Sequence, residues 1–255
     1  MTDLQAGVWV VALGAAVGSF LNVCIYRLPR GESVVSPPSH CPSCRRRLKW
    51  FENVPVLGWL IVGGRCRGCR TAVSPTYPIV ESLTALVFFF QYASLGWQPL
   101  LAVRLAFAGA MVVLCVIDLN HRILPNAITL PGVLLGLMAS VFLEPGWRDS
   151  LIGVVAGGGL LWLVGEIYFW LRGEEGMGMG DVKMLAMVGA FLGWQGMLVT
   201  LLLASLGGSL VGGLLIASRR GNLKYALPFG SFLAVAALLT THVGRALISW
   251  YLGFY

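Results

Sequence analysis

The chain has 255 residues, of which 57% are hydrophobic and only 11% are charged. About a quarter of the residues in an average soluble domain are charged, and the mean hydropathy here is +0.80. These values exclude a soluble globular enzyme, a disordered chain and a secreted disulfide scaffold. They predict a polytopic membrane protein, whose net charge of +7 is better explained by the positive-inside rule and by anionic lipid than by nucleic-acid binding.

Apolar runs of helical length predict an all-α fold with about eight transmembrane helices and one small polar insert. In chain order, the predicted spans are 8–25, 77–95, 100–117, 127–143, 151–171, 182–192, 197–217 and 228–250. The sixth of these runs is short for a membrane span. The predicted organisation is a first transmembrane helix (1–28), a cytoplasmic insert (29–75), a second helix with its outer turn (76–99) and a membrane core (100–255).

Lys and Arg are distributed unevenly between the two sides of these spans. The loops after odd-numbered spans, with their membrane edges, hold 15 of the 18 basic residues. Cytoplasmic loops are enriched in Lys and Arg, so we expect these loops to face the cytoplasm and both termini to lie outside. Trp97, Trp147 and Trp194 lie in the opposite loops, where an interfacial aromatic belt would place them.

Four of the six cysteines form two CxxC pairs, Cys41 with Cys44 and Cys66 with Cys69, and 21 residues separate the pairs. Four thiolates at this spacing suit one tetrahedral zinc ion, and disulfides are disfavoured in the cytoplasm. We expect a structural zinc, because so small an insert buries little core; free or redox-active pairs are the alternative. The other two cysteines lie in apolar runs and are expected to pack there. His40 is interpreted as a solvated loop residue.

Two aspartates lie at the ends of apolar runs. Asp118 closes the third predicted span, and Asp181 follows the Gly-rich segment 176–180 and opens the sixth. Two spans lie between them, so both carboxylates are expected at the cytoplasmic edge of the membrane. Either residue alone could simply flank or cap a helix. A carboxylate in a bilayer is costly, however, and two close carboxylates can share a proton and act as general base and acid on a peptide bond.

The loop before Asp181 supplies candidates for contacts with a substrate. Gly178 and Gly180 would let the backbone approach an extended peptide closely, whereas a dinucleotide loop would need a preceding strand. Lys183 could tune the aspartates or lie at the membrane interface. The neighbouring acids could bind a basic peptide or be solvated; they are Glu174 and Glu175.

Several short motifs accompany the CxxC pairs and the aspartates. They are residues 18–23, 27–29, 52–60, 77–81, 118–125, 178–183 and 228–230. Together these motifs resemble the type IV prepilin peptidases, which are membrane aspartic proteases of the GxGD class. The resemblance covers nearly the whole chain. The sequence departs from the family's pattern at Asn120 and Asn126, where many relatives have Asp.

The resemblance implies an enzyme of the bacterial cytoplasmic (inner) membrane that removes the basic leader of type IV prepilins and pseudopilins at the cytoplasmic face. It implies that Asp118 and Asp181 are the catalytic pair and that the four CxxC cysteines bind structural Zn²⁺. The partners would then be prepilins, pseudopilins and membrane lipid, without nucleic acid.

A second implied activity is methylation of the new N-terminal amine, usually that of Phe, with S-adenosylmethionine as donor. This implication rests on the zinc-bearing insert, because family members without it are typically peptidases only. No separate donor-binding domain is visible in the sequence. Glu81 and the segment 52–60 are candidates for methyl transfer.

Other functions stay open at this point. The nearest is a peptidase of the same type without methyl transfer. A presenilin or signal-peptide-peptidase relative would have Tyr in place of Ile117 and would lack the zinc insert. A carboxylate-dependent membrane transporter would favour carboxylates near the midplane and internal repeats, neither of which is evident. A membrane zinc-ribbon adaptor would leave the aspartates unused.

Overall fold

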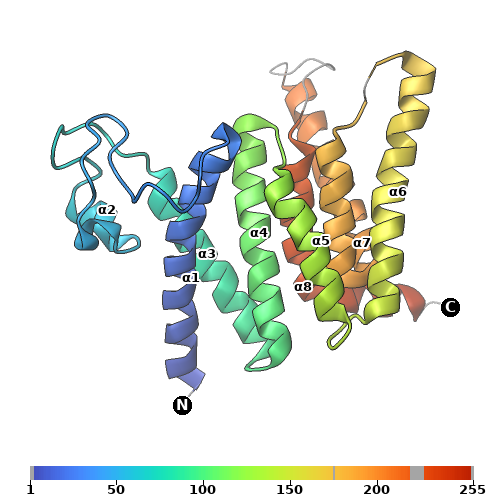
Figure 1. Ribbon diagram of the computed structural model, residues 1–255. Helices are drawn as coiled ribbons and strands as arrows, with labels where there is room; N and C mark the ends of the chain where they lie inside the picture. Colours follow the sequence, from blue (N-terminus) through green and yellow to red (C-terminus); the bar gives the residue numbers. More distant parts are fainter. Residues whose placement is uncertain (1–2, 175, 219–226, 254–255) are drawn as a thin grey trace. The chain divides into compact units, whose positions relative to one another are not determined.

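In the computed structural model, residues 3–174, 176–218 and 227–253 are described, and they form helices joined by loops, without a named strand. The helices (Figure 1) are α1 (Asp3–Arg27), α2 (Leu57–Ile61), α3 (Thr76–Leu95), α4 (Pro99–His121), α5 (Asn126–Ser140), α6 (Trp147–Arg172), α7 (Met179–Ala217) and α8 (Phe229–Leu252). Two short 3₁₀ helices, Leu28–Arg30 and Trp50–Asn53, lie between α1 and α2. The predicted all-α fold class is confirmed.

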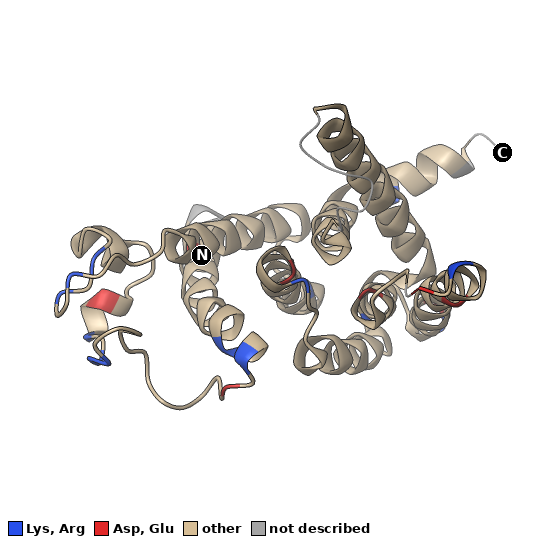
Figure 2. Cartoon of the chain, turned by 90° about the horizontal axis from the view of Figure 1, so that it is seen from above, with Lys and Arg blue, Asp and Glu red and all other residues tan. Residues whose placement is uncertain are grey.

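Six of the described helices are long and apolar enough to cross a membrane, namely α1, α3, α4, α6, α7 and α8. Helix α5 has only 15 residues and is shorter than the fourth predicted span. Charged residues are sparse along the helices and gather in the insert and near helix ends, as Figure 2 shows. This pattern is expected of helices that face lipid.

The predicted sixth and seventh spans are joined in α7, which is interrupted at Gly193. Gly193 has φ 72° and ψ 176°, a conformation that favours glycine. A Cβ at Gly157 of α6 would lie 2.8 Å from the Leu185 carbonyl oxygen and 3.2 Å from the Met197 Cγ. An unbroken helix would hold those two residues about 18 Å apart. The chain therefore reverses at Gly193, and α7 consists of two antiparallel halves.

The chain forms two compact units, Met1–Val113 and Leu114–Tyr255, whose boundary lies inside α4. The predicted boundaries at 28, 75 and 99 separate membrane segments rather than compact units, and they stay a prediction. In the first unit, α1 and α3 approach closely at Gly14 and Gly18, where an added Cβ would lie 2.7 Å from a Cα atom of α3. Small residues at such crossings are typical of membrane helices.

In the second unit, α6 runs antiparallel to the first half of α7. The Ser150 hydroxyl donates to the Ala190 carbonyl at 2.8 Å, whereas Gly157 lies beside Leu185. The second half of α7 runs antiparallel to α8, where Thr200 donates to the Thr240 hydroxyl at 3.0 Å. This packing holds the start of α7 beside the C-terminal part of α6, away from the turn at Gly193.

Candidate active site and metal centre

Asp118 lies in the last turn of α4, and its residue is 5% exposed. Its Oδ2 atom accepts hydrogen bonds from the Ser231 backbone N–H at 2.7 Å and from the Ser231 hydroxyl at 2.9 Å. Ser231 is in the first turn of α8, where backbone N–H groups lack partners within the helix and favour an anion. The two donors come from a position 113 residues away and fix the orientation of this carboxyl group.

Asp181 lies in the first turn of α7 and is half-buried. Its carboxyl group is close enough to Asp118 for the two charges to interact. Among the described residues, no hydrogen-bond donor contacts the Asp181 carboxyl group, although its backbone N–H donates to the Gly178 carbonyl at 3.0 Å. The two predicted carboxyl groups therefore lie in the same unit, one held by two donors and the other without a donor among the described residues.

Leu124 packs between the start of α7, which carries Asp181, and the start of α8, which carries Ser231. A Cβ at Gly180 would lie 2.9 Å from the Leu124 Cβ. A Cβ at Gly230 would lie 2.9 Å from the Leu124 Cδ1 and 3.1 Å from the Asp118 Oδ2. Real Cβ atoms rarely approach other atoms this closely, so neither glycine can gain a side chain without displacing its neighbours.

The other predicted loop residues differ in their relation to the aspartates. The Lys183 ammonium donates to the Asn126 Oδ1 at 2.9 Å, and it forms no ion pair with a described carboxylate. A Cβ at Gly178 would lie 3.7 Å from the Asp181 Oδ2, so the backbone here is open to a ligand. Glu174 is exposed, and Glu175 lies outside the described residues.

The four cysteine sulfurs of the insert form one cluster, in which all lie within 4.8 Å of one another. The Sγ atoms of Cys41 and Cys69 are 3.8 Å apart, and those of Cys44 and Cys66 are 3.9 Å apart. A tetrahedron with metal–sulfur bonds of about 2.3 Å has edges of about 3.8 Å. The quartet therefore fits a zinc ion. His40 does not belong to this cluster; its Nδ1 contacts the Pro38 carbonyl at 3.0 Å.

Each CxxC pair is closed by the same backbone turn. The Arg45 N–H donates to the Cys41 carbonyl at 2.9 Å, and the Arg70 N–H donates to the Cys66 carbonyl at 2.8 Å. Arg45 and Arg70 have φ values of 56° and 58°. The two turns are thus local, repeated devices that point pairs of sulfurs toward a common centre.

The segment 52–60 is anchored at two points, to Arg46 of the insert and to Glu81 of α3. Glu52 forms an ion pair with Arg46 at 2.7 Å, next to the first CxxC pair, and this guanidinium lowers the pKa of the Glu52 carboxyl group. The Val56 N–H donates to the Glu81 Oε2 at 2.6 Å. Val56 has φ 62°, which is unusual for a β-branched residue. The two predicted candidates for methyl transfer, Glu81 and this segment, are therefore in direct contact.

Sequence reasoning missed three residues of the second unit: Leu124, Glu166 and Ser231. Ser231 directly follows the motif 228–230, which indicates the segment but not the role of the Ser231 hydroxyl. Glu166 is the one charged residue in the predicted span 151–171, and an ionisable residue within a membrane helix is by default a candidate for function. Leu124 lies within the motif 118–125, but the sequence does not single it out, because its importance depends on contacts with residues far along the chain.

Comparisons with known proteins match both parts of the chain. Residues 12–95 match the Bacterial Peptidase A24 N-terminal domain, and residues 105–213 match the Type IV leader peptidase family. A Prepilin leader peptidase/N-methyltransferase of Aeromonas hydrophila is 39% identical, covering 92% of this chain and 90% of the relative. The protein of that name from Pseudomonas aeruginosa strain PAO1 is 34% identical, covering 96% and 92%.

A third relative of that name, from Myxococcus xanthus, is 41% identical over 82% of this chain, and the match spans 63% of that relative's length. No solved structure matches the chain significantly.

Proposed function

Because the chain belongs to the type IV leader peptidase family, we propose that it cleaves the basic leader from type IV prepilins and pseudopilins and then methylates the new N-terminal residue. The observation that carries the peptidase reaction is the packing of Gly180, next to Asp181, and of Gly230, next to Asp118, on the same Leu124 side chain at the start of α8, although 63 residues separate the two aspartates in sequence. The relatives' names support both activities.

In the peptidase reaction, the two carboxyl groups hold one proton between them, since two close carboxylates do not both ionise easily. The ionised group takes a proton from water, whose oxygen adds to the scissile carbonyl carbon. The protonated group donates to the carbonyl oxygen. The C–N bond then breaks as the leaving nitrogen gains a proton. Ser231 keeps Asp118 in place, while the Asp181 carboxyl group faces the peptide.

The cysteine quartet has a different task. A zinc ion with four thiolate ligands has no open position, so Cys41, Cys44, Cys66 and Cys69 would stabilise the insert rather than activate water. The insert in turn would hold the segment 52–60 against Glu81. We assign methyl transfer to this part of the first unit, with S-adenosylmethionine supplying the methyl group. The amine of the cleaved product would form a bond to the methyl carbon as the carbon–sulfur bond of the donor breaks, which would leave S-adenosylhomocysteine, and the amine would then lose a proton.

We place the reaction at the cytoplasmic face of the bacterial inner membrane, with both termini outside. The support is the distribution of basic residues, 15 of 18 on the side that carries the insert and both aspartates. The leader would reach the aspartates from the cytoplasm, while the apolar part of the pilin stays in the membrane. Membrane lipid would contact the helices' exposed apolar faces.

The deciding experiment is mass spectrometry of a prepilin incubated with the purified enzyme and S-adenosylmethionine. We expect a shortened product that carries one added methyl group. Asp118→Asn and Asp181→Asn should leave the prepilin intact, because each removes one half of the acid–base pair. A shortened product without the methyl group would support a peptidase alone, and an intact prepilin with the unchanged enzyme would refute the proposal.

A further inference from the structure

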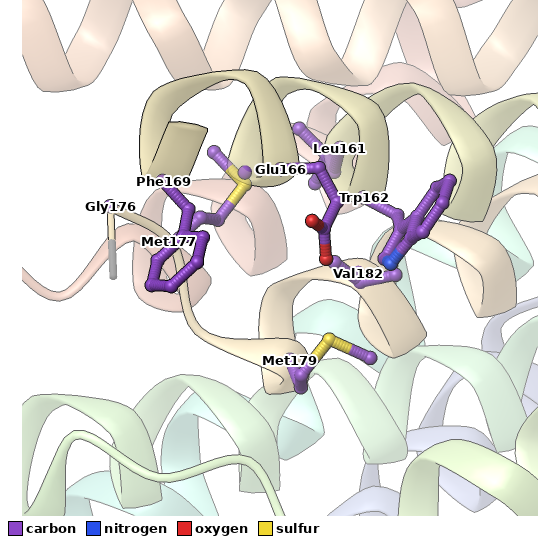
Figure 3. Close-up of a pocket in the computed structure, with 9 residues that line it drawn as sticks. Leu161, Trp162, Glu166, Phe169, Gly176, Met177, Met179 and Val182 are labelled. Carbon is purple, nitrogen blue, oxygen red and sulfur yellow. The ribbon is translucent and has the colours of Figure 1, made fainter. Parts of the chain in front are cut away.

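A pocket of about 280 Å³ lies between the C-terminal half of α6 and the loop that leads into α7. Figure 3 shows its walls, which are mainly apolar and aromatic and include Trp162, Phe169, Met177, Met179 and Val182. The aspartate pair and the zinc quartet do not account for this pocket. All of its lining residues belong to the second unit.

One carboxyl group faces this apolar pocket, that of Glu166 on α6, which points toward Val182 in Figure 3. Glu166 is half-buried, and no hydrogen bond or ion pair joins it to another described residue. It lies six residues before the end of α6 at Arg172, which places it about 9 Å from that end. A carboxylate at such a depth is costly without a partner, so packing within the described chain does not explain it.

The pocket adjoins the helical turn that carries Asp181. Met179 and Val182 line it, and both belong to the same helical turn as Asp181. Gly176 and Met177, which also line the pocket, precede that turn directly. A side chain bound here would therefore belong to the polypeptide whose backbone lies at Asp181.

We propose that this pocket binds a Lys or Arg side chain of the polypeptide being cleaved, and that Glu166 determines this specificity. The aliphatic stem of such a side chain suits the apolar wall, while its cationic head suits a carboxylate and aromatic rings. A neutral side chain would leave Glu166 unpaired, and an acidic one would be repelled. The inference rests on the proposed peptidase activity and adds the site that recognises one basic residue of the leader.

The test uses the full-length enzyme in detergent and prepilin-type peptides in which each leader Lys or Arg is replaced in turn by norleucine. Norleucine keeps an aliphatic stem but lacks the charge. For the fully basic peptide, Glu166→Gln should raise KM about tenfold, the size expected for losing one charge-assisted bond. The kcat should change by less than about twofold, because the residue binds substrate without entering the reaction.

Norleucine at one leader position should have the same effect in the unchanged enzyme and no further effect in Glu166→Gln. The matched control is Glu144→Gln, which removes a carboxylate paired with Arg245 outside the pocket. A direct binding measurement on the uncleaved peptides, made with Asp118→Asn alone and together with Glu166→Gln, should show the same tenfold weakening at that position.

The inference is overturned if Glu166→Gln leaves KM and binding unchanged, or if it weakens every norleucine peptide equally, which would indicate a structural role. It is also overturned if Glu166→Gln instead relieves inhibition by the cleaved product and N-acetylation of that product does the same, because the pocket would then bind the new amine. In all these outcomes the unchanged enzyme still cleaves. An unchanged enzyme that cleaves no peptide refutes the proposed function itself.

Discussion

The cysteine quartet and the aspartate pair are built over very different lengths of chain. Each CxxC pair is closed by a backbone hydrogen bond between residues four apart, such as Arg45 N–H to the Cys41 carbonyl. Asp118 instead depends on donors from Ser231, 113 residues away. The metal centre is therefore a property of two short turns, whereas the carboxyl pair exists only when three helix ends pack correctly. A substitution that disturbs helix packing should therefore impair the carboxyl pair and leave the metal centre intact.

Gly230→Val should produce the largest difference between the two sites. The new side chain would collide with Leu124 and the Asp118 Oδ2, and displacement of a catalytic group by about 1 Å can cost roughly 100-fold in rate. We expect leader cleavage, measured as kcat/KM, to fall by about this factor, while the zinc content stays the same. Gly213→Val is the matched control, because no atom lies within 4 Å of its Cβ position. Normal cleavage by Gly230→Val would contradict the close packing described here.

The converse change is Cys66→Ser, which removes one of the four thiolates. Metal binding and folding of a small zinc module are coupled, so we expect the zinc content, measured by plasma mass spectrometry, to fall from about one ion per chain to a small fraction. Methylation should be lost with it, since the segment 52–60 lies between the two CxxC pairs. Cleavage should persist in part.

Cys24→Ala is the control for Cys66→Ser, because Cys24 is a buried cysteine outside the quartet. An undiminished zinc content in Cys66→Ser would exclude this metal centre. Equal loss of cleavage and methylation would show that the two sites are not separable.

A smaller effect is expected from Ser231→Ala, which removes one of the two donors to Asp118 and keeps the backbone N–H. A hydrogen bond to a charged group contributes about 1.5–3 kcal/mol. Because the backbone donor stays, we expect a decrease of about tenfold in kcat/KM for cleavage. Ser249→Ala in the same helix is the control, since among the described residues its hydroxyl bonds only to the Ala246 carbonyl. A decrease as large as that of Asp118→Asn would show that the hydroxyl takes part in the reaction.

The separation along the chain between interacting residues also explains which parts of the two sites could be predicted from the sequence. The spacing of Cys41, Cys44, Cys66 and Cys69 is enough to predict their cluster, because the turns that form it are local. The parity of membrane crossings predicts Asp118 and Asp181 on the same side of the membrane, and in the second unit the residues next to them, Gly180 and Gly230, both pack on Leu124. It could not predict Ser231 as the donor, because parity does not specify which helix ends meet.

Side-chain partners across long separations were the least predictable part. Lys183 was considered as a neighbour of the aspartates, yet its ammonium bonds to Asn126, 57 residues away. The reversal at Gly193 was visible as a break between two apolar runs, but the length of α5 was overestimated. Apolar composition does not mark where a helix ends when its neighbouring loop is apolar as well.

The smallest expected effect concerns pH and the insert. The Arg46 guanidinium lowers the pKa of Glu52 in the folded protein, so Glu52 adds stability above its unfolded pKa of about 4.3. This contribution is lost as the pH falls through the folded value. Hydrogen exchange of the insert should therefore be faster in Glu52→Gln than in the unchanged protein near neutral pH, and the difference should disappear in acid. Acid also protonates the zinc thiolates and can release the metal, so the comparison is made over the pH range in which both proteins keep their zinc. Glu32→Gln, an exposed acid of the same insert, should show no such difference, and an acid-independent gap for Glu52→Gln would assign its effect to packing instead.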